Sequence, residues 1–330
     1  MSPRTGDGLT IGVDVGGTSV RAGVVDADGE ILDTATAPTP RTDDALEAAI
    51  TGAVDELRGR YPVRAAGLAL AGFVDAPRGL VRYAPHLSWR DAPVADRISE
   101  RLGGLPVVVE HDANSAALAE RRYGAAAGAS TVVVIALGTG IGGALLLGGD
   151  LFRGAHGVAP ELGHLRVVPD GRACPCGKRG CWERYCSGTA LATTALEMIS
   201  SADAPGPSVL AREAAADPGR ITGKRVAAAA REGDPVGRAA LDDLARWLGE
   251  GLSLVADVFD PDLVVLAGGV STSAPLFLDA AREHYTRVGT GAAHRPLARI
   301  RTAQLGAAAA VVGAATLARD AAVQIREPSS

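Results

Sequence analysis

Short apolar runs separated by glycine and aspartate turns make up the first 35 residues of the chain. Residues 9–13 and 20–25 are apolar runs on either side of Gly16-Gly17, and a turn at residues 26–29 precedes a third run at residues 30–35. Apolar runs of this length that are bounded by turn residues are typical of strands. We therefore predict that the chain begins with a meander of three strands.

Predicted helices and strands alternate along the rest of the chain. We predict helices over residues 44–58, 112–122, 236–257, 273–285 and 306–323, and strands over residues 65–71, 106–110, 131–137, 144–147 and 263–267. The two prolines of residues 201–208 predict a loop among helical segments. Alternation of strands with helices is the pattern of the α/β class, and this is the class that we predict.

The strand–turn–strand plan of the N-terminus recurs around the glycine-rich turn Gly138-Thr-Gly-Ile-Gly-Gly143. A repeated unit of this kind predicts two domains of similar build with a cleft between them. The length of 330 residues also favours two domains, because a single hydrophobic core rarely grows to this size.

Composition and charge exclude several classes of partner. The chain is 47% hydrophobic and 22% charged, an ordinary globular balance, and its net charge is −5. That charge provides no basic surface for nucleic acid or for an anionic membrane. No apolar run approaches the roughly 18–20 residues that span a bilayer, and the N-terminus lacks the apolar core of a secretory signal. We therefore expect a cytoplasmic protein that binds neither nucleic acid nor membrane.

One imidazole and three thiols are clustered in the middle of the chain, at His164, Cys174, Cys176 and Cys181. A His and three Cys form a complete tetrahedral ligand set for structural zinc, with no position left open for a catalytic water. Burial as small hydrophobes is disfavoured because the segment is rich in Gly and Lys, and a disulfide is disfavoured because a secretory signal is lacking. We predict a structural Zn²⁺ site at these four residues and a buried thiol at Cys186.

Two carboxylates, Glu161 and Glu183, lie at the ends of this zinc segment. Ionised carboxylates only accept hydrogen bonds, so a rigidly held pair is well suited to gripping the hydroxyl groups of a polyol. The predicted metal would then act as a clamp on a sugar-binding loop and not as a reagent.

Three glycine turns are candidates for holding a nucleotide. The second turn has the dinucleotide spacing G-x-G-x-x-G, but residues 144–147 are too short and apolar for the helix that must follow, so we reject a NAD site. A Walker phosphate-binding motif is also absent from the sequence. Exposed N–H groups of such turns can cradle phosphate, and an adjacent carboxylate suits Mg²⁺ held through water. The predicted residues are Asp14, Gly16, Gly17 and Thr18 in the first turn, Gly138, Thr139 and Gly140 in the second, and Gly268 and Gly269 in the third.

Each of these turns is, by itself, also compatible with a plain tight turn. Three of them on one chain, beside a loop suited to a polyol, indicate a nucleotide that faces a sugar.

Asp112 is the candidate catalytic base, in the segment Glu110-His-Asp112-Ala-Asn114 between a predicted strand and a predicted helix. In a kinase it would accept the proton of the sugar hydroxyl and orient the oxygen towards the γ-phosphate. The alternative is a purely structural helix N-cap, and the spacing does not decide between the two.

Taken together, these motifs resemble those of the ROK family, which groups bacterial sugar kinases with sugar-responsive repressors. The motifs are Asp14-x-Gly-Gly-Thr18, Glu110-x-Asp112-Ala-Asn114, Gly138-Thr-Gly140, Glu161-x-Gly-His164, Cys174-x-Cys-Gly-x-x-Gly-Cys-x-Glu183 and Gly268-Gly269. They occur in order over about residues 9–320, and the cysteine motif is the most specific. Within the family, residues 161–171, 180–185 and 259–262 look most like those of glucokinases from high-GC bacteria.

The resemblance implies an actin-like, hexokinase-type (ribonuclease H-like) fold of two α/β domains, with a terminal helix that packs back on the first. We place the first domain at residues 1–117 and 305–330, and the second, with the zinc loop, at residues 118–304. Family members are commonly homodimers or homotetramers.

The resemblance also implies a reaction, in which ATP with Mg²⁺ phosphorylates the 6-hydroxyl of a hexose, glucose being the first candidate. Asp112 would be the base. His164 would bind zinc through one ring nitrogen and sugar through the other, and Glu161 and Glu183 would bind hydroxyls near the anomeric carbon. Gly72, at the end of a predicted strand, and His111 complete the predicted sugar pocket.

Three residues depart from the family pattern: His111 and His86 stand where Asn is usual, and Pro160 stands where Gly or Ala is usual. An imidazole is bulkier than an amide and offers fewer donors. Kinases for N-acetylmannosamine, N-acetylglucosamine, mannose or fructose therefore stay open as alternatives, as does a catalytically silent sugar-binding protein. A repressor is disfavoured because fewer than ten residues precede Leu9.

Overall fold

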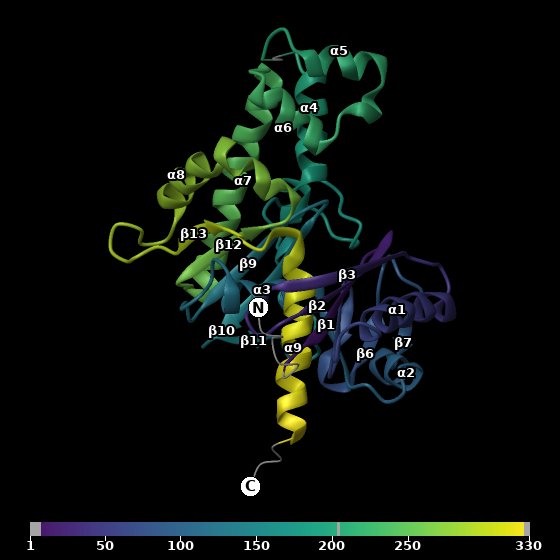
Figure 1. Ribbon diagram of the computed structural model, residues 1–330. Helices are drawn as coiled ribbons and strands as arrows, with labels where there is room; N and C mark the ends of the chain where they lie inside the picture. Colours follow the sequence, from purple (N-terminus) through teal and green to yellow (C-terminus); the bar gives the residue numbers. More distant parts are fainter. Residues whose placement is uncertain (1–7, 203–204, 327–330) are drawn as a thin grey trace, which may run out of the picture. The chain divides into compact units, whose positions relative to one another are not determined.

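The computed structural model describes residues 8–202 and 205–326, which divide into two compact units (Figure 1). The first unit runs to Gly128 and takes in Asp150–Ala159 and the segment from Gln304 onwards, and the second comprises Ala129–Gly149 and Pro160–Ala303. The predicted boundary between residues 117 and 118 would cut helix α3 (Asp112–Tyr123), which lies wholly in the first unit because it packs against the C-terminal helix.

The first unit is built on a five-stranded sheet in the order β3-β2-β1-β4-β8. Its strands are β1 (Thr10–Val15), β2 (Ser19–Val25), β3 (Ile31–Pro38), β4 (Ala66–Leu70) and β8 (Val107–His111). The first three strands are antiparallel neighbours, which confirms the predicted meander, whereas β1, β4 and β8 are parallel. Parallel strands end at the same edge of a sheet, so the residues that follow β1, β4 and β8 are brought to one edge.

Further helices and strands complete the first unit. They are helices α1 (Asp43–Arg58) and α2 (Val94–Arg101), a 3₁₀ turn at Ala76–Arg78, a small antiparallel sheet of β5 (Phe73–Asp75), β6 (Leu80–Tyr83) and β7 (Arg90–Ala92), and strand β11 (Asp150–Phe152). Ile50, Leu68 and Trp89, all fully buried, belong to the core that these elements share with the sheet.

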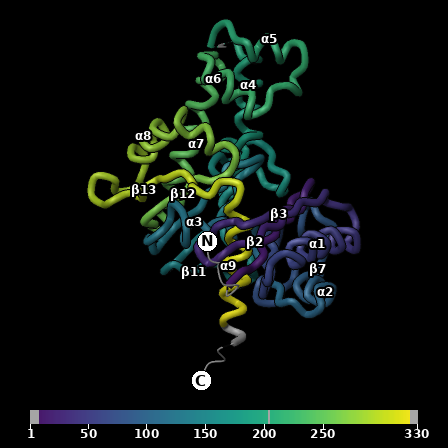
Figure 2. The backbone as a smooth tube through the Cα atoms, viewed as in Figure 1, coloured from purple at the N-terminus to yellow at the C-terminus, as the bar shows by residue number. Residues whose placement is uncertain are grey.

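Helix α9 (Ala309–Arg326) packs mainly on β1 and β4 of the first sheet, and Figure 2 shows it running past β2. It follows a 3₁₀ turn at Gly306–Ala308. A Cβ atom on Gly12 would lie 1.8 Å from the carbonyl oxygen of Val311, and one on Gly67 would lie 2.0 Å from that of Ala314. The two strands therefore have no side chain at the contact, and the helix backbone rests directly on the sheet.

This helix contains a stretch that could cross a membrane by length and composition only, although Arg319 and Asp320 interrupt its apolar run. Gly306–Val323 contains 18 residues with a mean hydropathy of 1.3, which meets the length and hydropathy of a membrane span. Inside the structure 44% of this stretch is buried, and its apolar face is covered by the sheet and by α3.

The second unit has its own sheet, whose strands within the unit follow the order β10-β9-β12-β13. They are β9 (Val132–Leu137), β10 (Ile141–Leu147), β12 (Leu263–Ala267) and β13 (Arg299–Thr302). β9 pairs with β10 in antiparallel and with β12 in parallel orientation. The predicted glycine turn at residues 138–143 is shorter than expected, because Ile141 already pairs with Leu137 and only residues 138–140 form the turn.

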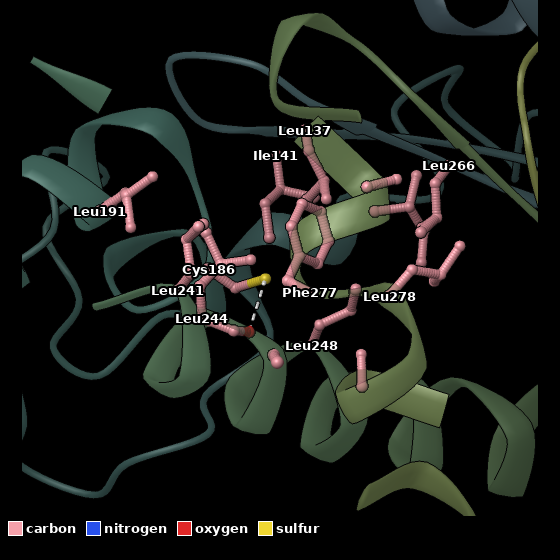
Figure 3. Close-up of a cluster of buried hydrophobic side chains, with 14 of the residues drawn as sticks. Leu137, Ile141, Cys186, Leu191, Leu241, Leu244, Leu248, Leu266, Phe277 and Leu278 are labelled. Atoms are coloured by element: carbon pink, nitrogen blue, oxygen red, sulfur yellow. Dashed lines mark hydrogen bonds between the residues drawn. The ribbon is translucent and has the colours of Figure 1, made fainter. Parts of the chain in front are cut away.

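Helices cover the sheet of the second unit. They are α4 (Gly188–Ser200), α5 (Val209–Ala216), α6 (Gly223–Arg231), α7 (Pro235–Phe259) and α8 (Leu278–Val288), with 3₁₀ turns at Leu162–His164, Trp182–Arg184, Pro218–Arg220 and Gly269–Leu276. The helix predicted over residues 273–285 is wrong at its start. Pro275 cannot donate a backbone hydrogen bond, and a 3₁₀ segment that contains it ends at Leu276, before α8 begins at Leu278. Leu244, Leu248 and Phe277 lie in the core between α7, α8 and the sheet (Figure 3).

We expect Gly67→Ala to destabilise the protein strongly, since its Cβ would collide with the backbone of α9 and not with a side chain that could turn away. Overpacking typically costs about 1–3 kcal/mol of unfolding free energy, and a collision with backbone should lie at the upper end of that range. Gly52→Ala is the matched control: Gly52 is exposed within α1 and has no atom within 4 Å of a built Cβ. That change should gain up to about 1 kcal/mol. Equal denaturation midpoints for the two variants would contradict the direct contact between helix and sheet.

Candidate active site

In the first unit, the parallel strands bring three predicted residues to one edge of the sheet. Asp14 lies near the end of β1, Gly72 follows β4, and Asp112 follows β8. Gly72 is required by close packing, because its Cβ would lie 2.5 Å from the carbonyl oxygen of Tyr83. His86 is near the first glycine turn, with its Cβ 3.2 Å from the position of a Cβ on Gly17.

The carboxyl group of Asp14 is mostly buried, with 18% of its side chain exposed, and its pKa is raised. Burial is the main cause, because it penalises the charged form, and the negative charge of Asp112 adds to it. Arg21, whose NH2 atom is 3.2 Å from Asp14 Oδ2, opposes the shift. Asp14 and Asp112 lie at the same edge of the sheet, because β1 and β8 both run parallel to β4. Gly17 and Thr18 of the same turn are exposed.

Asp112 is the first residue of α3, and His111 occupies the N-cap position. The Oδ1 atom of Asp112 accepts a hydrogen bond from the N–H of the next residue, Ala113, at 2.7 Å. A side chain that caps a helix instead accepts from an N–H two or three residues further along the chain. The N-cap alternative for Asp112 is therefore wrong, and its carboxylate, 41% exposed, is open to a ligand.

The junction between β8 and α3 is held by the buried carboxylate of Glu110, of which 3% is exposed. Oε1 accepts hydrogen bonds from the His111 N–H and from Asn114 Nδ2, both at 2.9 Å. Oε2 accepts one from Arg153 Nε at 2.7 Å. Sequence reasoning missed this role, since Arg153 is 43 residues away and no motif connects it with Glu110.

In the second unit, the four predicted metal ligands come together. The ligand atoms of His164, Cys174, Cys176 and Cys181 all lie within 4.8 Å of one another. Cys174 Sγ is 3.7 Å from His164 Nδ1, and Cys176 Sγ is 3.6 Å from Cys181 Sγ. Tetrahedral zinc with Zn–S bonds of about 2.3 Å needs ligand atoms about 3.8 Å apart, so the residues fit the ion.

Cys186, the fourth cysteine, is separate from this cluster. It is fully buried in the core of the second unit, where its thiol donates to the carbonyl oxygen of Leu244 at 3.8 Å (Figure 3). Burial raises the pKa of this thiol, so it stays protonated, as predicted for a buried cysteine.

Both candidate sugar-binding carboxylates adjoin the cysteine cluster. His164 Nε2 is 3.8 Å from Glu161 Oε2, so its Nδ1 faces the thiols while its other nitrogen faces a carboxylate. Cys174 Sγ donates to Glu183 Oε1 at 3.2 Å. The Glu183 side chain lies against the second glycine turn, because a Cβ on Gly140 would be 2.4 Å from its Oε2.

The second unit also contains a cavity of about 800 Å³ beside the second and third glycine turns. Gly138, Thr139 and Gly269 line it, whereas Gly268 has a φ of +82° and packs against the backbone of Leu137. The volume of this cavity is that of a site for a cofactor-sized molecule.

Two helix N-termini meet at this cavity, a feature that sequence reasoning missed. Residues 188–189 of α4 and 222–224 of α6 line it, and Ser187 and Thr222 cap the two helices. Free N–H groups at helix N-termini attract phosphate, and Lys224 adds a cation. In the sequence, the only indication of these N-termini is a hydroxyl residue before a glycine, at Ser187 and at Thr222. That pattern does not predict a shared site, because the two helices meet only in the folded unit.

Two α/β units, each with helices packed on a mixed sheet, define a hexokinase-type fold of the actin-like class. The chain belongs to the ROK family, whose model matches residues 10–321.

Its relatives include a glucokinase from Streptomyces coelicolor, which is 45% identical over 95% of this chain and 98% of its own. A ROK family glucokinase from Streptomyces griseus, solved in complex with glucose and AMPPNP, is 46% identical over 95% of this chain and all of its own, with a TM-score of 0.82. A ROK hexokinase from Thermus thermophilus is 33% identical over 97% of this chain and 99% of its own, with a TM-score of 0.79.

We expect Asp14→Asn to raise the thermal midpoint at pH 7.5. A raised pKa means that ionised Asp14 opposes folding above that pKa, so the amide removes a cost that is present at neutral pH and lost as the pH falls through the pKa. The gain should shrink towards pH 4.5. Asp279→Asn, with 95% of the side chain exposed, should show no such pH-dependent gain. Thermal unfolding at both pH values tests this, and a stabilisation that is larger at acid pH would contradict it.

We expect the purified protein to hold one zinc ion per chain and Cys176→Ser to lose it, because three ligands bind far more weakly than four. Cys176 is exposed, so the change itself disturbs no packing. Cys186→Ala is the control and should keep the metal. Elemental analysis after dialysis provides the measurement, and equal zinc contents in the two variants would refute the assigned ligand set.

Proposed function

We propose that the protein is an ATP-dependent glucokinase that transfers the γ-phosphoryl group of ATP to the 6-hydroxyl of glucose. The observation that carries the proposal is the 46% identity, over 95% of this chain, to a glucokinase solved with glucose and AMPPNP. The placement of Asp14 and Asp112 at one edge of the first sheet supports it, since a base and a carboxylate suited to a cation are parts that phosphoryl transfer needs.

Asp112 is the proposed catalytic base. As the sugar oxygen attacks the γ-phosphorus, the carboxylate takes the hydroxyl proton, the bond from the γ-phosphorus to the bridging oxygen breaks, and ADP leaves. Oδ1 already accepts the Ala113 N–H, so we assign proton transfer to Oδ2.

ATP is proposed to occupy the cavity of the second unit, where the predicted residues Gly138, Thr139 and Gly269 line the wall. The other two predicted contacts, Gly140 and Gly268, do not line it, and they would shape the turns that do. The N-termini of α4 and α6 and the ammonium of Lys224 support this assignment, because all three favour phosphate. The first glycine turn, with Gly16, Gly17 and Thr18, would contact the terminal phosphates. Asp14 would hold Mg²⁺ through water, and that ion would offset charge on the transferred group.

The zinc segment is proposed to bind the sugar. Glu161, Glu183 and the Nε2 atom of His164 would hydrogen-bond its hydroxyls, and Gly72 and His111 would line the remainder of the pocket. The four ligands of Zn²⁺ would keep this loop rigid. By resemblance to the family, we expect a homodimer or homotetramer, which light scattering on the purified protein would test.

We expect glucose to give the highest turnover in an assay of ADP release with ATP and Mg²⁺ against glucose, mannose, fructose, N-acetylglucosamine and N-acetylmannosamine. Turnover dominated by another sugar would keep the reaction and overturn the substrate. If none of the five sugars gives turnover but calorimetry still shows sugar binding, the protein is a catalytically silent sugar-binding protein and not a kinase.

We expect Asp112→Asn to lower kcat by about 10²–10⁴-fold, the contribution of a positioned general base. Sugar binding, measured by calorimetry, should persist because the amide is isosteric with the carboxylate. The matched control is Asp91→Asn, an exposed residue of β7 whose loss should leave kcat unchanged. Near-normal turnover by the Asp112 variant would exclude it as the base.

A further inference from the structure

The side chain of Arg153 reaches the junction that bears the proposed base. Arg153 follows β11, and its Nε atom donates to Glu110 Oε2 at 2.7 Å, where only 3% of the Glu110 side chain is exposed. The other oxygen of that carboxylate accepts from the N–H of His111, the residue before Asp112, at 2.9 Å. One buried carboxylate therefore joins Arg153 to the backbone next to the base.

The backbone of the same arginine closes a loop that leads to a candidate sugar ligand. The carbonyl oxygen of Arg153 accepts a hydrogen bond from the Ala159 N–H at 3.2 Å. Gly157 packs this loop on β5, because a Cβ atom there would lie 2.2 Å from the carbonyl oxygen of Val74. Glu161 is only two residues beyond Ala159 in the chain. Arg153 thus fixes the point from which the chain continues to Glu161.

We propose that Arg153 is a positioning residue, which links the start of the sugar-binding segment to the junction that carries Asp112. This inference rests on the proposed kinase function. The side chain of Arg153 holds the junction through Glu110, and its backbone holds the loop that ends next to Glu161. A single residue then sets the positions of the base and of a sugar ligand.

The burial of Glu110 makes this link strong. A buried carboxylate costs free energy unless a cation and hydrogen-bond donors meet it. The donors are the His111 N–H, Asn114 Nδ2 and Arg153 Nε, and among the described residues Arg153 alone forms an ion pair with Glu110. A shift of the loop would leave the carboxylate without its cation, so the loop and the junction are expected to move together.

Two substitutions separate this link from a simple need to neutralise Glu110. Met places a methyl group where arginine has Nε, so Arg153→Met removes the donor and the charge at nearly constant shape. Glu110→Gln then removes the unpaired charge, while its amide oxygen can still accept from His111 and Asn114. The double variant therefore has no unpaired buried charge at this junction, but it lacks the link.

We expect Arg153→Met to lower kcat about ten- to hundredfold, as a base misplaced by about 1 Å would, and to raise the KM for glucose severalfold. The double variant Glu110→Gln/Arg153→Met should recover most of the thermal midpoint but neither kcat nor this KM. Arg153→Lys, which keeps a charged donor, should keep kcat within about threefold. The KM for ATP should be unchanged in all three variants.

Arg78→Met is the matched control, because Arg78 is an arginine of the same unit that is 72% exposed and pairs with Asp75. This variant should leave kcat and both KM values unchanged. Recovery of kcat by the double variant would show that Arg153 only neutralises Glu110, and would overturn the proposal. A loss of kcat in Arg153→Lys as large as in Arg153→Met, or a change confined to the KM for ATP, would also overturn it.

A second measurement does not depend on turnover. In hydrogen exchange followed by mass spectrometry, Arg153→Met should speed the exchange of backbone amides in residues 107–116. Glu110→Gln, whose NH2 group would face Arg153, should speed it in residues 153–161, and α7 should be unaffected in both variants. Exchange that changes only around the substituted residue would overturn the link, even if the protein phosphorylates no sugar. Reciprocal exchange effects with unchanged kinetics, in a protein that phosphorylates glucose, would overturn the positioning role and leave the kinase function standing.

Discussion

The contact between the backbone of α9 and the sheet of the first unit is the constraint on which the position of the catalytic candidates depends. Gly12 and Gly67 let the helix rest on β1 and β4, and Gly313 on the other side of the helix packs against α3, where a Cβ would lie 1.7 Å from the carbonyl oxygen of Ser115. α3 carries Asp112 at its first residue. A shift of α9 would therefore move the proposed base relative to Asp14 on β1.

The zinc segment and the cavity of the second unit are parts of one continuous stretch of chain. Cys181 is a candidate metal ligand and Glu183 a candidate sugar ligand, and the cap of α4 follows at Ser187. The Gly188 N–H then donates to the carbonyl oxygen of Gly138 at 2.8 Å, which joins the helix to the second glycine turn. Trp182 anchors the stretch on α7, since its Nε1 donates to the carbonyl oxygen of Trp247 at 2.8 Å. Few residues separate the metal ligands from the cavity, so the anchoring of this stretch on α7 holds both sites in place.

Sequence patterns predicted the elements whose signal is local. The strands around Gly16-Gly17 and Gly138, the helix after Asp112 and the cluster of three cysteines with His164 depend on runs and spacings within a few residues, and the structure has them. The β5–β7 sheet was missed because its strands have only three or four residues.

Features that depend on the tertiary fold were out of reach of the sequence. The bond between Glu110 and Arg153 and the meeting of α4 with α6 at the cavity join distant segments. The contact of His111 with Asp112 joins neighbours in the chain, but its direction depends on the helix that begins there. Sequence reasoning recognised an unusual residue at position 111 and could not determine which group its ring would face.

The hydroxyl of Thr10 donates to the carbonyl oxygen of Ala315 at 2.8 Å, across 305 residues of sequence. During synthesis, β1 and β4 leave the ribosome long before α9, with the whole second unit made in between. The face of the first sheet that contains Gly12 and Gly67 is thus not yet covered by α9 at a stage when all strands and helices of the second unit have been synthesised. Because contacts of such long range form slowly, the first unit is the part of the nascent chain that most needs protection from aggregation.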